Sequence, residues 1–430
     1  MADIEYLKTL QAVRERSRLV LEAAKQGKTN NFTFHQDRMQ DVTEFVASVI
    51  DRDFGPDKYS SIPPHGRWQH FDVGNVARVD ELHNQWKNDG LNREEIVRRL
   101  IDLFFVSVLL DAGAGDVWTF KEPGSGAVFN RSEGIAVASL YMFKAGAFSS
   151  DPENNPARVD GKGLNALTVE AFEKYFQISP ENPIIGVEAR VNLLKNVGTS
   201  LLNNTDVFGQ DGRPGQLVDN ILGETQSSEP IDYHTLWDTL QKVLLPSWPK
   251  DRTRISGIPI GDAWPLKVLQ DLAGPDAPET ATIQPFHKLT QWLAYSLSVP
   301  FVRVLGRTWK NMDSGTGLPE YRNGGLFTDL GVLTLKDEVL QQGLQRSGHE
   351  KLPSFPASGD VIVEWRALTV ALLDELHGLI SKHYEPRGVQ LTMAQMLEAG
   401  TWKGGRELAA KHRPETKSSP ILIEGDGTLF

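Results

Sequence analysis

The feature that most constrains this sequence is an apolar spacing of three to four residues, repeated along most of the 430-residue chain. This spacing is typical of amphipathic helices. In the first such segment, residues 4–26, Leu7, Leu10 and Val13 share one helix face, and Gly27 predicts the end of the helix. Further helices are expected over residues 38–51, 76–87, 94–110, 132–146, 165–177, 186–202, 232–245, 285–304, 332–345, 361–384 and 392–412.

Strand-like runs are few and short. They lie at residues 255–260 and in the tail 421–430, where Gly-Asp-Gly at 425–427 suits a tight turn. The chain shows no βαβ alternation and no internal repeat of 20–50 residues. We therefore predict a mostly α fold, a large single helical domain over residues 1–430 with a small β element. Residues 1–150 are the segment that could form an N-terminal subdomain.

The composition of the chain excludes several classes of chemistry. The chain has no cysteine, which excludes disulfides, thiol catalysis and iron–sulfur clusters. Its net charge of −11 argues against nucleic-acid binding, because phosphate neutralisation needs clustered Lys and Arg. Phosphate-loop, Rossmann, Gly-x-Ser-x-Gly and His-Glu-x-x-His motifs are absent, and the ten His residues are not spaced as metal ligands. We expect a small-molecule partner and neither metal nor cofactor.

The sequence gives no sign of a membrane segment. The longest apolar run, residues 104–110, includes Ser107 and is far shorter than the roughly 20 residues that span a bilayer. The first 27 residues are charged throughout and lack the apolar stretch of a secretory signal. We therefore expect a cytoplasmic protein without a membrane partner; the sequence does not fix its oligomeric state.

The segment 106–118 joins an apolar helix to a glycine-rich turn. Asp111 follows the helix, and Trp118 follows the glycines. A carboxylate and an indole at such a turn could hold the hydroxyl groups and the planar face of a ligand. The alternative is a helix C-terminus followed by a core tryptophan.

The segment 130–139 reads as the start of a helix. Ser132 is expected to cap it, which would place Glu133 in the first turn, where the helix dipole favours an acid. Arg131 could pair with an anion at the same helix end. A purely structural role for these residues is the alternative.

The segment 285–297 places polar and aromatic groups on a very apolar helix. At a spacing of four residues, His287, Gln291 and Tyr295 share one face, with Lys288 and Trp292 beside them. Such a face could read a sugar or a base. Polar core groups satisfied by neighbouring loops would look the same.

The segment 315–331 is expected to be a glycine-rich loop. Loops held by a rigid scaffold often carry function, and burying several polar groups is costly without a purpose. Its polar residues are Glu320, Tyr321, Arg322, Asn323 and Asp329. A solvated surface turn is the alternative.

Glu364 and Arg366 lie inside an apolar run at 361–374. Buried charges need partners, so the two either complete an ion-pair network, which is the favoured interpretation, or contact a substrate. A loop at 64–70 with two His and one Arg is likewise assigned a structural role.

Several of these motifs together resemble one known family. They are Leu-Leu-Asp-Ala-Gly-Ala-Gly at 109–115, Arg-Ser-Glu-Gly at 131–134, Ala-Gly-Ala-Phe-Ser-Ser at 145–150, Pro-Phe-His-Lys at 285–288, Gly-Leu-Pro-Glu-Tyr-Arg-Asn-Gly-Gly at 317–325 and the run at 364–374. The chain resembles the uracil catabolism protein 4 family of fungi and bacteria over nearly its whole length. That resemblance implies a route in which the pyrimidine ring is opened with the ribose attached, leaving a ribosylurea from which urea must be released.

A fainter resemblance points to the queuosine-nucleotide N-glycosylase (queuine salvage) family, which has a helical, DNA-glycosylase-like fold. Asp111 and Trp118 match its Leu-Asp-x-Leu-Asn-Phe-x-Phe-Trp stretch, and Glu-Tyr-Arg at 320–322 matches its Asp-Tyr-Arg loop. Tyr295 and Ser296 stand where that family has a catalytic aspartate. The resemblance implies cleavage of an N-glycosidic bond on a fold that is in part DNA-glycosylase-like.

Breaking a ribosyl C1′–N bond passes through an oxocarbenium-like state, which needs a carboxylate and a proton donor. We expect a metal-independent N-glycosyl hydrolase with Glu320 as catalytic carboxylate and Asp111 or Asp329 as its partner. The basic residues expected to bind a 5′-phosphate or the urea oxygen are Arg322, Lys288 and His287. The aromatic residues expected to exclude water are Tyr321, Trp118 and Trp292. The other predicted substrate contacts are Gln291, Tyr295, Asn323, Arg131, Glu133, Glu364 and Arg366.

Two other functions stay open. A non-catalytic regulator or scaffold of the pathway would bind a nucleotide and release no product. An amidohydrolase acting on a ureido group would release carbamate or ammonia in place of urea.

Overall fold

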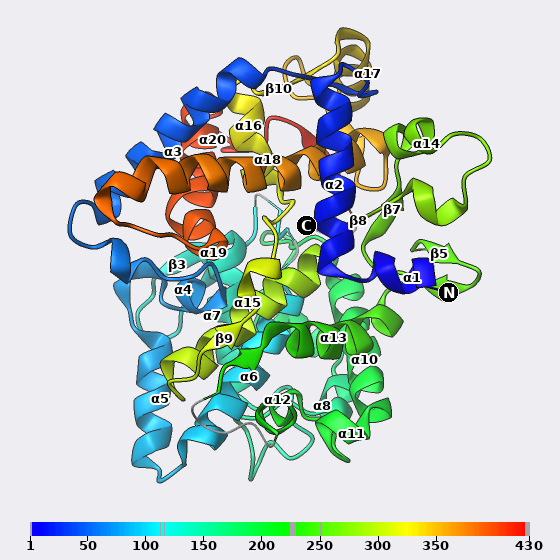
Figure 1. The fold of residues 1–430 in the computed structure, drawn as a ribbon. Coiled ribbons are helices and arrows are strands. Elements are labelled where there is room, and N and C mark those ends of the chain that lie inside the picture. The colour runs from blue at the N-terminus through cyan, green and yellow to red at the C-terminus, as the bar shows by residue number, and fades with distance from the viewer. Residues whose placement is uncertain (1, 112, 116, 224–228, 250–251, 426–430) are drawn as a thin grey trace. The chain divides into compact units, whose positions relative to one another are not determined.

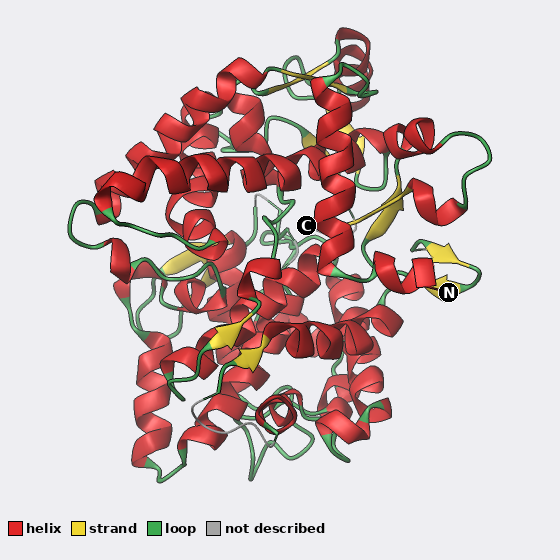
Figure 2. Cartoon of the chain, viewed as in Figure 1, coloured by secondary structure: helices red, strands yellow, loops and turns green. Residues whose placement is uncertain are grey.

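The computed structural model describes residues 2–111, 113–115, 117–223, 229–249 and 252–425. Helices make up 60% of the structure and the strands form only small pairs, so the mostly α prediction is confirmed. Figure 2 shows the helices in red and the short strands in yellow. No helix in these ranges combines the length and the apolar character that crossing a bilayer would need.

The described residues group into two compact units, each made of discontinuous segments. Unit 1 comprises Met1–His65, Arg252–Lys288 and Asp313–Gly425, and unit 2 comprises Gly66–Asp251 and Leu289–Met312. The chain therefore changes unit after residue 65, inside the segment 1–150 that we considered as a subdomain. The number of independently folding domains stays a prediction.

Unit 1 is built on long helices and four strand pairs. Its helices are α1 (Ala2–Leu7), α2 (Leu10–Lys25), α3 (Met39–Phe54), α14 (Lys267–Ala273), α16 (Tyr321–Asp329), α17 (Asp337–Ser347), α18 (Asp360–Tyr384), α19 (Met393–Met396) and α20 (Trp402–His412). A π-helical turn, Leu397–Thr401, joins α19 to α20. The antiparallel pairs are β1 (Phe32–Phe34) with β10 (Leu333–Leu335), β5 (Arg254–Ile255) with β6 (Ile258–Pro259), and β7 (Ala263–Pro265) with β8 (Ile283–Pro285). The parallel pair is β11 (Ser354–Pro356) with β12 (Leu422–Glu424).

Unit 2 is also helical. Its helices are α4 (Arg67–Phe71), α5 (Arg78–Asn88), α6 (Arg93–Leu109), α7 (Arg131–Lys144), α8 (Gly161–Ala166), α9 (Val169–Tyr175), α10 (Val187–Asn203), α11 (Thr205–Phe208), α12 (Leu217–Leu222), α13 (Tyr233–Leu244) and α15 (Lys288–Arg303), which starts at the last residue of a unit 1 segment. Its strand pairs are β2 (Thr119–Lys121) with β3 (Val128–Asn130), antiparallel, and β4 (Ile231–Asp232) with β9 (Trp309–Lys310), parallel.

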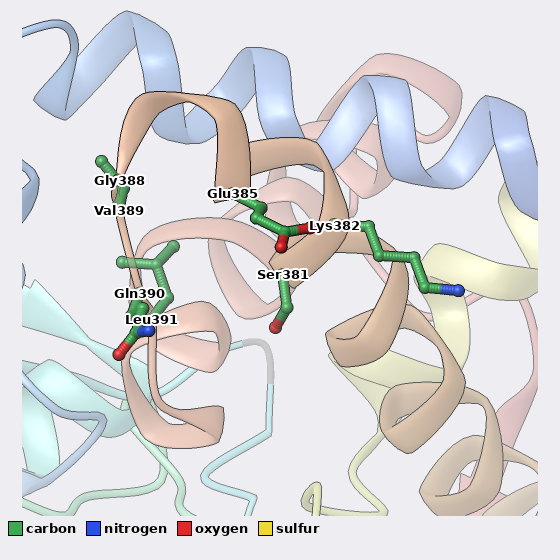
Figure 3. A pocket seen from close by; sticks show the side chains of 7 residues that line it. All are labelled: Ser381, Lys382, Glu385, Gly388, Val389, Gln390 and Leu391. Carbon is green, nitrogen blue, oxygen red and sulfur yellow. The ribbon is translucent and has the colours of Figure 1, made fainter.

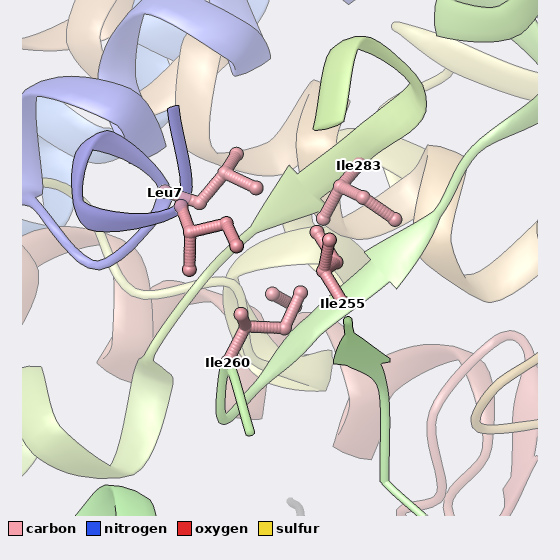
Figure 4. Packing of buried hydrophobic residues seen from close by; sticks show 6 residues of the cluster. Leu7, Ile255, Ile260 and Ile283 are labelled. Carbon is pink, nitrogen blue, oxygen red and sulfur yellow. The ribbon is translucent and has the colours of Figure 1, made fainter. Parts of the chain in front are cut away.

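Helix α18 organises unit 1. Its residues from Ile362 to Leu373 are all buried, so the helix is surrounded on every side over this stretch. It packs against α2, α3 and α16 (Figure 1), and Arg14 of α2 donates to Asp374 at 2.9 Å. A smaller apolar cluster joins α1 to the strands of residues 254–285 (Figure 4). Its members are Ile4, Leu7, Ile255, Ile260, Ala263 and Ile283.

In unit 2 the apolar helix α6 packs against α4 and α7, and all of its residues from Leu100 to Leu109 are buried. Helices α8 and α10 approach closely through two glycines. A Cβ at Gly161 would lie 2.7 Å from the carbonyl oxygen of Gly198. Only glycine fits such a crossing without moving the backbone.

Most of the expected helices are present, with shifted ends. The expected helix 4–26 is divided, because Thr9 accepts a hydrogen bond from the Ala12 amide and starts α2 afresh. Gly27 follows that helix with a φ of 69°, as its position predicted. The run 255–260 forms the β5–β6 pair, and the tail forms β12, whereas residues 426–430 and the turn expected there lie outside the described residues.

Two local predictions were wrong. The segment 315–331 is not a loop throughout, because α16 begins at Tyr321. Its glycines serve close packing: a Cβ at Gly324 would lie 2.8 Å from the Trp365 ring of α18. Ser132 does not cap α7, which starts one residue earlier, at Arg131 with a φ of 51°.

Candidate functional site

The predicted site residues are divided between the two units. Those in unit 1 are His287, Lys288, Glu320, Tyr321, Arg322, Asn323, Asp329, Glu364 and Arg366. Those in unit 2 are Asp111, Trp118, Arg131, Glu133, Gln291, Trp292 and Tyr295. Each unit is therefore considered by itself.

In unit 2, Asp111 is held by a buried arginine that the sequence did not single out. Arg67, at the start of α4, is fully buried, and its Nη1 lies 2.7 Å from Asp111 Oδ2. Its Nε donates to Ser107 Oγ at 2.8 Å, and Ser107 in turn accepts from Ser139 of α7 at 2.6 Å. The Asp111 side chain is 9% exposed, so a fixed carboxylate reaches the end of α6 with part of its surface open.

Two carboxylates, Asp111 and Glu133, act on the buried guanidinium of Arg67. Burial lowers the pKa of Arg67, and the charges of Asp111 and Glu133 oppose that effect. The Nδ1 atom of His70 lies 3.1 Å from Arg67 Nη1, and the His70 ring lies beside Trp292, with centroids 5.5 Å apart. The only signal for Arg67 was its place in the loop 64–70, which we had assigned a structural role.

A second buried arginine, also not identified from the sequence, holds the backbone near Asp111. Arg190 of α10 is 1% exposed and donates to the carbonyl oxygens of Leu110, Gly113 and Ile185, the last two at 2.8 and 3.1 Å. Burial lowers its pKa to about 10. These bonds hold both sides of the turn that carries Asp111, which a periodicity argument could not have found.

Trp118 has the contacts of a core residue. It is fully buried, its Nε1 donates to the Phe176 carbonyl oxygen at 2.9 Å, and it stacks on the Phe176 ring. This matches the alternative of a core tryptophan stated above. On α15, Gln291 is fully buried and Tyr295 is 2% exposed, and the Tyr295 ring lies 6.3 Å from that of Tyr233.

In unit 1, the start of α16 presents an acid, a phenol and a guanidinium in succession. Glu320 occupies the N-cap position without a capping side-chain bond. The Arg322 guanidinium lies 4.7 Å from the Tyr321 ring centroid, and its Nη1 donates to the Lys417 carbonyl oxygen at 3.0 Å. Asn323 donates to Leu318 O, so its amide fixes the turn before the helix.

Asp329, at the other end of α16, is bound by a structural partner. Both of its oxygens accept from Arg413 at 2.6 Å, and its side chain is 6% exposed. A bidentate, nearly buried ion pair accounts for this carboxylate without any ligand.

Asp262 ties Arg366 to the start of α15. Its two oxygens accept from Arg366 Nη1 and Nη2 at 2.8 and 2.7 Å, and further bonds come from Trp264 Nε1 and the Lys288 amide. Burial alone would raise the pKa of Asp262, but Arg366, together with the bonds from Trp264 and the Lys288 amide, outweighs that effect and brings it to about 2. Arg366 thereby positions the backbone of Lys288.

The Lys288 side chain is unusual for a buried cation. It is 8% exposed, and its ammonium has no hydrogen-bond or ion-pair partner within the described ranges. Charged side chains this enclosed are normally paired, so Lys288 is a candidate for binding an anion. Trp365 and Arg366 of α18 are consecutive, one packing on α16 and the other holding Lys288 through Asp262.

His287 and Glu364 have backbone partners. His287 Nε2 lies 2.8 Å from the Leu7 carbonyl oxygen, and burial lowers the pKa of the imidazole, which keeps it neutral. Glu364 accepts from the amides of Asn30, Asn31 and Phe32 at 2.9–3.0 Å, although burial raises its pKa. Both contacts stabilise unit 1, and a substrate role for either residue stays a prediction.

Three cavities of unit 1 lie away from all predicted residues. The first, of about 450 Å³, is lined by the end of α18 and the turn after it (Figure 3). Others of about 500 and 390 Å³ lie between the start of α3 and α18, and beside the turn after α20. Within the parts of the chain that the structure describes, no cluster of three or more His, Asp or Glu residues could hold a metal ion.

Comparison with known proteins gives full-length matches. Residues 6–430 match the family described as "Protein of unknown function (DUF1688)". The chain is 46% identical over 440 residues to "Uracil catabolism protein 4" of Lachancea kluyveri, covering 99% of each. It is 45% identical over 425 residues to "Protein urg3" of Schizosaccharomyces pombe, covering 99% of this chain and 98% of that protein.

Proposed function

This chain belongs to the DUF1688 family, and from that premise we propose that it acts in the degradation of uracil, as the name of its Lachancea kluyveri relative says of that protein. The proposed reaction is hydrolysis of the C1′–N bond of a ribosylurea or its 5′-phosphate, which releases urea. Water adds to C1′, the bonding electron pair leaves with the urea nitrogen, and that nitrogen takes up a proton.

The observation that carries the proposal is the Lys288 side chain, which is 8% exposed and whose ammonium has no hydrogen-bond or ion-pair partner among the described residues. A 5′-phosphate is an anion that such a group would bind, since charge-assisted hydrogen bonds are worth about 1.5–3 kcal/mol each. Gly324 of α16 packs on Trp365 of α18, and the next residue, Arg366, holds the Lys288 backbone through Asp262. The start of α16 also offers a carboxylate and a guanidinium, the groups that the reaction needs. The Glu320 carboxylate would stabilise the positive charge at C1′, and Arg322 would donate to the urea oxygen.

The direct test is to incubate the purified protein with ribosylurea and with its 5′-phosphate and to detect urea by mass spectrometry. Glu320→Gln is expected to lower kcat by ~10²-fold or more, the range for loss of one group that stabilises a transition state. Glu375→Gln, on a partly exposed carboxylate that pairs with Lys25, is the matched control with unchanged kcat. Asp111→Asn, tested in parallel, decides whether the carboxylate of unit 2 is the one required.

A second variant tests whether the substrate carries a 5′-phosphate. Lys288→Met is expected to raise KM for the 5′-phosphate by ~10–100-fold and to leave KM for free ribosylurea unchanged, because only the phosphate interacts with the ammonium. Undiminished turnover in Glu320→Gln would overturn that residue's assignment. Release of ammonia or carbamate would indicate the amidohydrolase, and binding without any product would indicate the regulator.

A further inference from the structure

The cavity of about 390 Å³ beside the turn after α20 brings together basic side chains from two segments of unit 1. One segment is the loop that follows α17, which contributes His349 and Lys351. The other begins with His412, the last residue of α20. All three residues are exposed, so their side chains are accessible to a ligand from solvent.

His349 is oriented by the backbone of its own loop. The amides of Lys351 and Leu352 both donate to His349 Nδ1, at 3.0 and 3.1 Å. A backbone amide can only donate, so Nδ1 carries the lone pair and Nε2 carries the proton. The His349 Nε2–H is therefore a hydrogen-bond donor held in a defined direction. A metal ion would need a lone pair at Nε2, so this arrangement suits an anion.

Lys351 and His412 add donors that the protein itself does not use. Neither the Lys351 ammonium nor the His412 imidazole makes a hydrogen bond or an ion pair with any described residue. The ammonium offers three N–H donors, and the neutral imidazole offers one. With the Nε2–H of His349, the cavity therefore presents donors from three side chains.

Two other charged residues line the cavity. Arg413 is fully engaged, because both of its Nη atoms donate to Asp329 at 2.6 Å and its Nε donates to the Ser418 carbonyl oxygen at 2.9 Å. These bonds fix the turn after α20 on α16. Glu415 makes no ion pair with a described residue, and its carboxylate opposes the binding of an anion. That opposition provides a test of the sign of the ligand's charge.

Apolar side chains supply another part of the lining. They are Leu352, which is 8% exposed, and the rings of Pro414 and Pro420. A bare inorganic ion would leave these surfaces in contact with water. An organic group attached to the anion would cover them, and the burial of apolar surface would add to its affinity.

We propose that this cavity binds a phosphomonoester that carries a small ring-shaped organic group. The three terminal oxygens of the phosphate would accept from His349, Lys351 and His412, and charge-assisted hydrogen bonds of this kind are the strong ones. A carboxylate has two oxygens and a single charge, so it would use fewer of the donors. The site is separate from that of the proposed hydrolysis, and the inference does not depend on that function. Asp329, the partner of Arg413, lies about 13 Å along α16 from Glu320 at 1.5 Å per residue.

Nitrogen-15 NMR of the histidine rings, with phenyl phosphate as the probe, observes this cavity directly. The signals of His349 and His412 are assigned by their loss in His349→Asn and in His412→Asn. We expect both signals to shift and to saturate as phenyl phosphate is added. Inorganic phosphate, which leaves the apolar lining uncovered, is expected to bind ~3–10-fold more weakly. Benzoate is expected to bind ~10-fold more weakly, and phenol, which has the ring without the charge, is expected to cause no saturable shift.

Two variants change the charge of the lining in opposite directions. Lys351→Met is expected to raise the Kd for phenyl phosphate by ~10–100-fold, because one charge-assisted hydrogen bond is lost. Glu415→Gln removes a repulsive charge and is expected to lower the Kd by ~3–10-fold. Lys382→Met is the matched control, since Lys382 is also exposed but lines the cavity at the end of α18, and its Kd is expected to equal that of the wild type.

Several results would overturn the proposal. They are an unchanged Kd in Lys351→Met, weaker binding in Glu415→Gln, or a saturable shift with phenol equal to that with phenyl phosphate. Tighter binding of benzoate than of phenyl phosphate would refute the assignment to a phosphomonoester. If Lys351→Met does not fold, Glu415→Gln decides. The spectra need no turnover, so a protein that releases no urea would refute the proposed function and leave this test intact.

Discussion

Replacing Arg366 by methionine tests the view that this residue organises unit 1 and does not bind substrate. The substitution removes the guanidinium but keeps an apolar stem of similar length inside the buried helix α18. Asp262, 1% exposed, then loses two hydrogen bonds of 2.7–2.8 Å and keeps those from Trp264 and the Lys288 amide.

The magnitude follows from the pKa of Asp262. In the folded protein it falls from 3.8 to about 2, against the opposing effect of burial. Each pKa unit is worth about 1.4 kcal/mol, so the ionised carboxylate stabilises the fold by ~2–3 kcal/mol at neutral pH. Removing only one partner leaves a buried, unpaired charge, and we expect Arg366→Met to lower the free energy of unfolding by ~3–5 kcal/mol at pH 7.

The pKa of Asp262 also determines the direction in which stability changes with pH. In the wild type the stabilisation is present above the unfolded pKa of Asp262 and is lost as pH falls through about 2. In Arg366→Met burial dominates and raises that pKa above 3.8, so the folded variant takes up a proton more readily than the unfolded chain. The difference in free energy of unfolding between the wild type and the variant is therefore expected to shrink as the pH falls from 7 towards ~4.

Urea unfolding followed by far-ultraviolet circular dichroism measures this loss in the free energy of unfolding at several pH values. The double variant Asp262→Asn/Arg366→Met is the control, because it leaves no buried charge and is expected to be more stable than Arg366→Met alone. A deficit below ~1 kcal/mol, or one that does not change with pH, would refute the reasoning.

Three further predictions concern stability. Asp329→Asn breaks a nearly buried bidentate ion pair and should lower the free energy of unfolding by ~3 kcal/mol. The folded variant should keep its kcat, which an assay of urea release at low temperature would show. Gly405→Ala places a Cβ 2.2 Å from the Arg322 carbonyl oxygen and should lower the free energy of unfolding, measured by urea titration, by ~2–3 kcal/mol. Gly378 has open space around it on α18, so Gly378→Ala should instead stabilise the protein by up to ~1 kcal/mol. His287 has a lowered pKa, so the folded state binds fewer protons than the unfolded chain; melting temperatures should fall as pH drops below 6.5 in the wild type, and less so in His287→Asn.

The candidate site shows where sequence reasoning reaches its limit. The predicted carboxylates Asp111, Glu320 and Asp329 were similar in sequence, because each lies near glycines at the edge of an apolar segment. The structure separates them by their partners: Asp329 is clamped by Arg413, whereas Arg67 holds Asp111 from one side. A partner 44 or 84 residues away leaves no local pattern from which it could be inferred.

The expected loop at 315–331 was wrong for a related reason. Glycines predict loops when only local propensity is considered, since they weaken an isolated helix. In α16, Gly324 faces Trp365, and the absence of a side chain lets the two helices approach. Burial against a neighbour supplies more stability than the propensity removes, and that neighbour is known only from the tertiary structure.

By itself the sequence determined what depends on short-range order. Apolar periodicity established a mostly helical chain, Gly27 ended its first long helix, and the lack of cysteine removed thiol chemistry. Only the tertiary structure decided which polar groups meet, as in the pairs Asp262–Arg366 and His65–Glu398, separated by 104 and 333 residues. Helical periodicity specifies which face is buried, whereas the partner of a buried charge depends on how distant segments pack, and that information is not local to any motif.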